Sequence, residues 1–132
     1  MKLNHIAFWT QDIDRLFAFY QKYFEGQVIF SKEIPNFKCT FIKICSSVVL
    51  EIMSVPNLEK RKNKFTVGHS HISLEVDSKG EVDRLTAYFE NEGIPFEKKR
   101  EQYDDGFYES AIIDPDGNII EFAYLDRSIT NF

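Results

Sequence analysis

The sequence predicts an α+β fold made of two βαβββ modules within one domain of 132 residues. Two observations predict it. The order strand, helix and three strands occurs twice along the chain, and each copy places a histidine at its first strand and a glutamate at its last. A hydrophobic content of 43%, which includes 13 phenylalanines, is enough to build a core in a chain of this length.

The first module is expected over about residues 1–55. It begins with an apolar strand within 3–10 and continues into a helix within 13–26, with Asp12 as its N-cap and Gly26 as its stop. The apolar positions of this helix have amphipathic spacing and are Ile13, Leu16, Phe17, Tyr20, Tyr23 and Phe24. Three strands follow within 27–34, 37–45 and 47–55, separated by turns at Pro35-Asn36 and Ser46-Ser47.

A polar, basic connector over about residues 56–68 leads to the second module, which is expected over about 69–126. Its helix within 79–93 places Val82, Leu85 and Phe89 on one face, and Gly93 lies past its end. Its strands are expected within 69–77, 95–103, 106–114 and 118–124, with turns at "DDG" (104–106) and "DPDG" (114–117).

An internal repeat supports this division at the level of single residues. "HIAF" (5–8) aligns with "HISL" (71–74), and "VVLEI" (48–52) aligns with "NIIEF" (118–122). The histidine precedes the glutamate by 46 residues in the first copy and by 50 in the second (51 − 5 and 121 − 71). Each module therefore offers one imidazole and one carboxylate at matching positions.

Glu51 and Glu121 each interrupt an apolar strand, where an isolated ionised carboxylate would cost several kcal/mol. For either residue alone, a side chain pointing to solvent is an adequate explanation. Their shared repeat position, with His5 and His71 matched in the same way, favours a divalent metal site with nitrogen and oxygen ligands. His69 competes with His71 because both have the same strand parity; the repeat alignment selects His71, and His69 is expected to be exposed or to support a ligand.

Composition excludes several classes of function. A net charge of −5 argues against nucleic acid or an anionic membrane as the main partner. The sequence has no stretch of about 18 apolar residues and no signal peptide at its start, so a cytoplasmic protein is expected. Cys39 and Cys45 are expected to be free thiols. The basic runs at 59–64 and 98–100 are expected to be solvated surfaces, with a clamp for an anionic substrate as the alternative for 59–64.

Four motifs together resemble the vicinal-oxygen-chelate superfamily, which includes glyoxalase I, fosfomycin-resistance enzymes and extradiol dioxygenases. They are "LNHIAF", "VVLEIMSVP", "GHSHISLEVD" and "DPDGNIIEF", and the resemblance spans about residues 2–125. It implies a cupped eight-stranded mixed sheet, a small-molecule substrate, a homodimer, and a metal held by His5, Glu51, His71 and Glu121. Nickel or zinc is the expected ion, with manganese, cobalt or iron as alternatives.

The same resemblance implies a glyoxalase-like lyase or isomerase. A substrate with adjacent oxygens, such as the hemithioacetal of a thiol and a 2-oxoaldehyde, would chelate the metal, and Glu121 would shuttle a proton while Glu51 holds the metal or alternates with it. Trp9 stands where bacterial glyoxalases have a glutathione-binding arginine; it either encloses a different substrate or packs on its neighbours. A metallothiol transferase, a dioxygenase and a non-catalytic ligand-binding protein of the resistance type remain alternatives.

Overall fold

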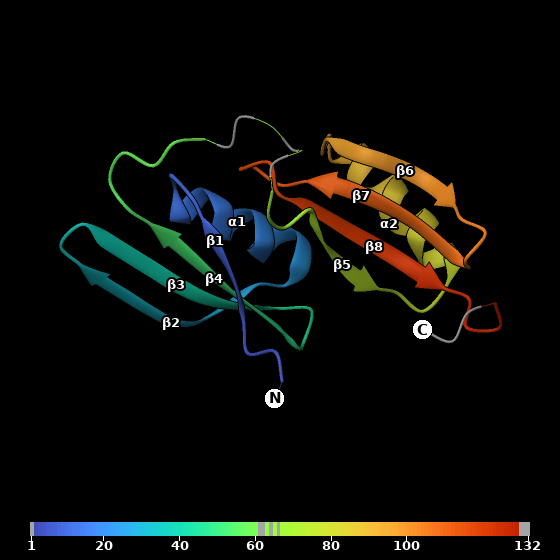
Figure 1. The fold of residues 1–132 in the computed structure, drawn as a ribbon, viewed down its shortest axis with the longest axis horizontal. Coiled ribbons are helices and arrows are strands. Elements are labelled where there is room, and N and C mark those ends of the chain that lie inside the picture. Colours follow the sequence, from blue (N-terminus) through green and yellow to red (C-terminus); the bar gives the residue numbers. More distant parts are fainter. Residues whose placement is uncertain (1, 61–62, 64, 66, 130–132) are drawn as a thin grey trace. The chain divides into compact units, whose positions relative to one another are not determined.

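The computed structural model describes residues 2–60, 63, 65 and 67–129. The chain divides into two compact units, unit 1 over Met1–Lys62 and unit 2 over Asn63–Phe132. Each unit has the order βαβββ, which confirms the predicted fold class (Figure 1). Unit 1 contains β1 (Ile6–Trp9), α1 (Ile13–Phe24), β2 (Gln27–Ile34), β3 (Phe37–Ile44) and β4 (Val48–Ser54). Unit 2 contains β5 (His71–Glu75), α2 (Lys79–Asn91), β6 (Phe96–Gln102), β7 (Phe107–Ile113) and β8 (Ile119–Leu125).

Each unit forms one four-stranded mixed sheet, and the two sheets have the same strand order. The order is β1-β4-β3-β2 in unit 1 and β5-β8-β7-β6 in unit 2. The first and last strands of each unit pair in parallel, and the other pairs are antiparallel. One helix packs on one face of each sheet (Figure 1). Glu51 and Glu121 point to the other face, because side chains alternate along a strand and the preceding residues, Leu50 and Ile120, lie in the core.

Helix α1 begins as the sequence predicts but ends differently. The side chain of Asp12 caps it by accepting a hydrogen bond from the backbone amide of Arg15 at 3.0 Å. Its C-cap is Glu25, which has a left-handed backbone with φ of 53°, so the expectation that glycine makes this turn is wrong. Gly26 follows with its amide bonded to the carbonyl of Tyr20, and a Cβ there would lie 2.9 Å from the Tyr20 backbone. Glycine is needed at position 26 because the backbone there passes too close to the backbone of Tyr20 for a side chain to fit.

Each unit has a core between its helix and its sheet. In unit 1 the fully buried core side chains are Leu16, Tyr20, Ile42, Ile44, Leu50 and Ile52. In unit 2 they are Val82, Phe89, Ile112 and Ile120. Ala111 is also fully buried, but as the direct partner of Glu121 it lies on the other face of the sheet. Burying a large apolar side chain contributes about 1.5–3 kcal/mol, so these clusters hold each helix on its sheet.

Two buried helix residues were missing from the predicted apolar faces. Phe19 in α1 packs edge-on against Tyr20, with ring centroids 5.4 Å apart. Thr86 in α2 is fully buried because its hydroxyl bonds the carbonyl of Val82 and the hydroxyl of Ser110, at 2.7 and 2.8 Å. A polar residue with its hydrogen bonds satisfied can occupy a core position, which a count of apolar residues does not detect.

Both cysteines are free, as predicted, with Cys39 buried in β3 and Cys45 exposed in the turn after it. The strand predicted over 37–45 ends one residue earlier, because Cys45 adopts a left-handed backbone. Although Cys45 is exposed as a residue, its thiol is partly enclosed, and this partial desolvation and the nearby charge of Glu25 raise the pKa of the thiol. None of the helices in the described part of the chain has the length and apolar character of a membrane span.

Candidate functional site

In unit 1, His5 and Glu51 meet on the sheet face opposite α1. Strands β1 and β4 are parallel, and Ala7 is the direct partner of Glu51, so His5 lies two residues before that partner and has the same parity. The Nε2 atom of His5 lies 3.3 Å from Oε2 of Glu51. Sequence and register therefore bring the predicted imidazole and carboxylate into direct contact.

In unit 2, His71 and Glu121 repeat this arrangement. Strands β5 and β8 are parallel, and Ser73 is the direct partner of Glu121, so the histidine again lies two residues before the partner. The Nε2 atom of His71 lies 3.8 Å from Oε2 of Glu121. The two pairs therefore have the same register in both units.

The other ring nitrogen of each histidine is held by the residue just before it. Nδ1 of His5 lies 2.8 Å from the side-chain oxygen of Asn4, and Nδ1 of His71 lies 3.2 Å from the hydroxyl of Ser70. A hydrogen bond at Nδ1 orients the ring and leaves Nε2 as the nitrogen that faces the glutamate. This is the usual arrangement of a histidine that coordinates a metal through Nε2.

The structure places the four predicted ligands as two pairs, one in each unit. Across the residues that the structure describes, no group of three or more His, Cys, Asp or Glu side chains is close enough to hold a metal ion. The donor chemistry of each pair nevertheless fits a divalent transition metal, because a neutral imidazole and a carboxylate are both ligands of such ions.

Glu121 is the more enclosed of the two candidate acids, since its side chain is 6% exposed and that of Glu51 is 16% exposed. Burial alone would raise the pKa of Glu121, but hydrogen bonds from Ser73 and Lys98 and the positive charge of Lys98 outweigh it and lower that pKa. Glu121 is therefore held as a carboxylate, which is the form that can bind a cation or accept a proton.

Lys98 and Glu109 also lie beside Glu121, and neither was predicted from the sequence as a site residue. The ammonium of Lys98 contacts Oε1 of Glu109 and lies 3.0 Å from Oε2 of Glu121. The expectation that the basic run at 98–100 is a solvated surface is therefore wrong for Lys98. Burial would lower the pKa of Lys98, but the two carboxylates outweigh it and raise that pKa. Burial raises the pKa of Glu109, against the opposing effect of Lys98.

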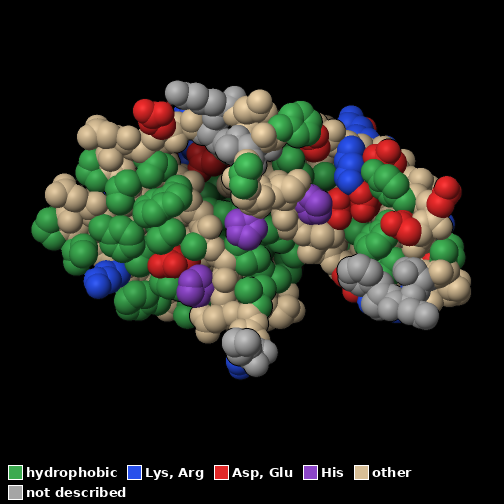
Figure 2. Space-filling model, viewed as in Figure 1, with side chains coloured by type: hydrophobic (Ala, Val, Ile, Leu, Met, Phe, Trp, Pro, Cys, Tyr) green, Lys and Arg blue, Asp and Glu red, His purple; other side chains and the backbone are tan. Residues whose placement is uncertain are grey.

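The corresponding face of unit 1 is aromatic instead of charged. The ring of Phe41 meets the ring of His5 edge-on, with centroids 5.3 Å apart. The ring centroids of Phe30 and Phe41 are 6.1 Å apart. Trp9 in β1 is 51% exposed, so it has surface available for a ligand. Figure 2 shows hydrophobic side chains gathered over β2 and β3, and acidic and basic side chains over the strands of unit 2.

Two further predicted features have less to do with these pairs. His69 is exposed and lies before β5. The basic connector at 59–64 includes residues 61, 62 and 64, which lie outside the described residues, so its role as an anion clamp or a solvated segment stays a prediction.

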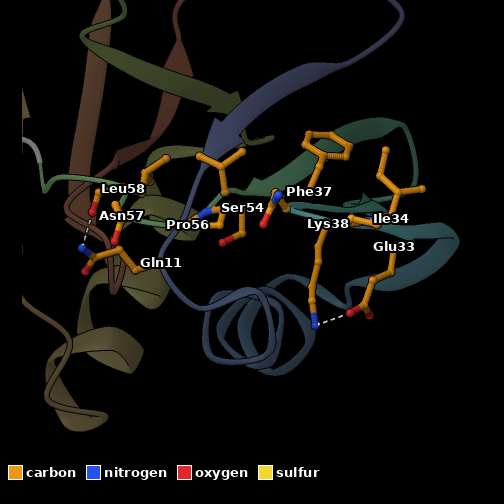
Figure 3. Close-up of a pocket in the computed structure, with 12 residues that line it drawn as sticks. Gln11, Glu33, Ile34, Phe37, Lys38, Ser54, Pro56, Asn57 and Leu58 are labelled. Atoms are coloured by element: carbon orange, nitrogen blue, oxygen red, sulfur yellow. Dashed lines mark hydrogen bonds and ion pairs between the residues drawn. The ribbon is translucent and has the colours of Figure 1, made fainter.

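A cavity of about 760 Å³ lies in unit 1 beside the turn between β2 and β3 (Figure 3). Its charged lining residues neutralise each other, because Nζ of Lys38 lies 2.7 Å from Oε1 of Glu33. On its other side, the side-chain amide of Gln11 donates to the carbonyl of Leu58 at 2.6 Å. The lining includes neither His5 nor Glu51, so this cavity and the histidine–glutamate pair are distinct features of the unit.

Comparison with known families gives one match over nearly the whole chain. The family model described as "Glyoxalase/Bleomycin resistance protein/Dioxygenase superfamily" matches residues 2–122. This range includes all four predicted ligands together with Lys98 and Glu109, and it confirms the resemblance that the sequence motifs indicated.

Solved structures agree on the fold. A glyoxalase/bleomycin resistance protein/dioxygenase domain from Frankia sp. superposes with a TM-score of 0.82 at 14% identity, covering 96% of this chain and 98% of that one. The fosfomycin resistance protein FosX of Listeria monocytogenes gives 0.75 at 23% identity, with 96% and 94% covered. Lactoylglutathione lyase from Agrobacterium tumefaciens gives 0.69 at 26% identity, with 93% and 92% covered.

Proposed function

Because the chain belongs to the glyoxalase/bleomycin resistance protein/dioxygenase superfamily, we propose that it is a metal-dependent lyase or isomerase acting on a small oxo compound. One observation supports this most directly. In each unit, a histidine Nε2 faces a glutamate oxygen at the same register of the parallel strand pair. A solvent-facing glutamate would have no reason to occupy that position twice.

In this proposal His5, Glu51, His71 and Glu121 supply the ligands of one divalent ion. The side chains of Asn4 and Ser70 fit such a role, because each holds Nδ1 and leaves Nε2 for coordination. Nickel or zinc is our first expectation, and manganese, cobalt or iron would accept the same nitrogen and oxygen donors.

Glu121 is proposed to move the proton, with Glu51 holding the ion or alternating in that role. A bound divalent cation would stabilise negative charge that develops on the substrate oxygens. Glu121 suits proton transfer because its side chain is only 6% exposed and its Oε2 faces the imidazole of His71 at the proposed metal site. A positioned base of this kind contributes about a hundredfold to ten-thousandfold in rate.

The substrate is proposed to be a small molecule with adjacent oxygens and an apolar part, such as the hemithioacetal of a 2-oxoaldehyde. The aromatic surface formed by Trp9, Phe30 and Phe41 beside His5 suits an apolar group better than a charged one. The similarity to a lactoylglutathione lyase supports the reaction class. Trp9 offers no charge to a glutathione carboxylate, which favours a different thiol.

Metal analysis of the purified chain is the first test. We expect one equivalent of ion per chain after reconstitution, measured by mass spectrometry of the metal content and equilibrium dialysis. The paired changes His5→Ala/Glu51→Ala and His71→Ala/Glu121→Ala should each abolish tight binding, because one ion takes ligands from both pairs. If either paired variant still binds half as many ions per chain as wild type does, the idea of one shared ion is contradicted. Light scattering on the same samples tests the expected homodimer.

Turnover is the second test. The metal-loaded protein should convert at least one of the methylglyoxal hemithioacetals of cysteine, bacillithiol and glutathione, followed by ultraviolet absorbance. Glu121→Gln should lower the rate by about a hundredfold or more. Glu75→Gln is a matched control, because Glu75 has the same strand parity as His71 but pairs with Arg127. A metal-loaded protein that turns over none of the three would count against the glyoxalase reaction.

A further inference from the structure

The side chain of Lys98 holds the same oxygen of Glu121 that faces His71. Nζ of Lys98 lies 3.0 Å from Oε2 of Glu121, and Nε2 of His71 lies 3.8 Å from that same Oε2. The ammonium of Lys98 and the imidazole of His71 therefore both lie near Oε2 of Glu121, the oxygen that a metal ion would need as a ligand. An ion bound between His71 and Glu121 would have to share this oxygen with the ammonium or replace it.

Glu109 gives Lys98 a second place to bind. Its Oε1 contacts the same Nζ, and its side chain is 8% exposed, so it is almost as enclosed as that of Glu121. In the strand ladder, Lys98 and Glu121 both pair with Ala111, which places them on either side of one residue of β7. An ammonium released from Glu121 would thus remain paired with a carboxylate and would leave no buried charge without a partner.

Unit 1 provides an internal comparison, because its sheet has the same strand order. Residues that pair directly across the four strands of a sheet form one row. In unit 1 the row that contains Glu51 is Ala7, Glu51, Phe41 and Phe30. In unit 2 the row that contains Glu121 is Ser73, Glu121, Ala111 and Lys98. Phe30 therefore occupies the position of Lys98. In unit 2, Glu109 pairs with Ala123, which lies two residues after Glu121. In unit 1, the residue two after Glu51 is Met53, and its partner is Cys39. The pair formed by Lys98 and Glu109 therefore occurs in unit 2, and the equivalent positions of unit 1 hold Phe30 and Cys39.

We propose that Lys98 is a built-in counter-ion that competes with a divalent metal for Glu121, and that Glu109 is the carboxylate that receives the lysine when the metal binds. Lys98 and Glu109 are then positioning residues that set metal affinity without being ligands. The inference rests on the proposed function, since it takes His71 and Glu121 as part of a metal site. It explains why a lysine lies beside Glu121, a proposed metal ligand, and contacts a second enclosed carboxylate.

Substitutions at the two residues should change metal affinity in opposite directions. Lys98→Met removes both the competitor and a repelling charge, so the affinity for Zn²⁺ or Ni²⁺ should rise by about tenfold or more. Glu109→Gln leaves Glu121 as the lysine's remaining carboxylate partner at this site, so the affinity should fall. Lys99→Met is the matched control, because Lys99 is the next residue of β6 but pairs with Glu90 of α2, with Nζ to Oε1 at 2.9 Å.

The measurement is a dissociation constant, obtained by competition with a chromophoric chelator on the full-length, metal-stripped protein. Lys99→Met should match wild type. In a double-mutant cycle, Glu109→Gln should have a much smaller effect when Lys98 is already Met, because Glu109 acts through the lysine. If Lys98→Met does not give a folded protein by circular dichroism, Lys98→Gln removes the charge and keeps a hydrogen-bond donor.

An unchanged or weaker affinity in the folded Lys98 variant would overturn the inference, as would an undiminished effect of Glu109→Gln in the double variant. These results would leave the proposed function standing if wild type binds metal and turns over substrate. Metal binding that depends on Lys98 in a protein without turnover would support the inference and count against the proposed reaction. If neither wild type nor the Lys98 variant binds either metal, both proposals fail.

Discussion

At the scale of single residues, Gly26 follows α1 where the chain folds back against the helix. A Cβ at this position would lie 2.9 Å from both the carbonyl carbon and the oxygen of Tyr20. These are backbone atoms, so they have little freedom to move away. We expect Gly26→Ala to lower the free energy of unfolding by about 1–3 kcal/mol, measured by urea denaturation.

Gly80 in α2 serves as the control for this substitution. A Cβ there would have Ser78 Oγ as its nearest neighbour, at 3.7 Å, which is an ordinary contact. Because alanine favours helix more than glycine does, Gly80→Ala should be neutral or stabilise by up to about 1 kcal/mol. Equal destabilisation by the two changes would show that the close approach at Gly26 is not what matters.

The direction of single side chains also explains which site residues the sequence predicted. Glu51 and Glu121 lie in uninterrupted ladders, so strand alternation places them on the correct face. Lys98 lies in β6, where the pairing with β7 shifts register on both sides of it. Alternation fails at such irregularities. The sequence therefore could not tell that Lys98 points to Glu121 while Lys99 points to Glu90.

At the scale of elements, the two helices end in different ways. Glu25 caps α1 with a left-handed backbone, φ 53°, whereas Glu92 caps α2 with a right-handed one, φ −77°. A left-handed backbone is unfavourable for residues with a Cβ and costs glycine nothing. We expect Glu25→Gly to stabilise the protein by about 0.5–1 kcal/mol, measured as a shift of the urea midpoint at unchanged slope.

Glu92→Gly tests whether backbone conformation is the cause. A right-handed residue gains nothing from glycine and loses about 0.5–1 kcal/mol through the added freedom of the unfolded chain. The two substitutions remove the same side chain, so their effects should have opposite signs. Stabilisation in both cases would instead point to the loss of a negative charge.

The order and type of the helices and strands in the described part of the chain follow from sequence periodicity, but their ends do not. Asp12 is a recognisable N-cap because its side chain can reach a free amide. The C-terminal end of α1 depends on a glutamate in a glycine-like conformation, which local sequence does not signal. The strand predicted over residues 3–10 shortens to β1 because pairing with β4 limits it.

At the scale of the whole molecule, each of the two units has a core built in a similar way between its helix and its sheet. Ile52 in unit 1 and Ile120 in unit 2 are both buried, at 0% and 1% exposure. Each side chain packs within its own unit, so its removal should loosen that unit first. We expect Ile52→Ala and Ile120→Ala to cost about 2–5 kcal/mol each.

Hydrogen exchange followed by mass spectrometry distinguishes local from global effects. Exchange should increase first in peptides from α1 and β3 for Ile52→Ala, and in peptides from α2 and β7 for Ile120→Ala. An equal increase throughout the chain in both variants would show that the two cores open as one cooperative unit.

The common offset between histidine and glutamate in the two parallel strand pairs bears on the evolutionary origin of the chain. A half-length ancestor with this topology would already carry a complete imidazole and carboxylate pair, so two identical copies would supply four donors. Gene duplication would then free each half to diverge around a fixed pair. Phe30 and Lys98, which have the same ladder position in the two halves, would then be one place where the copies diverged.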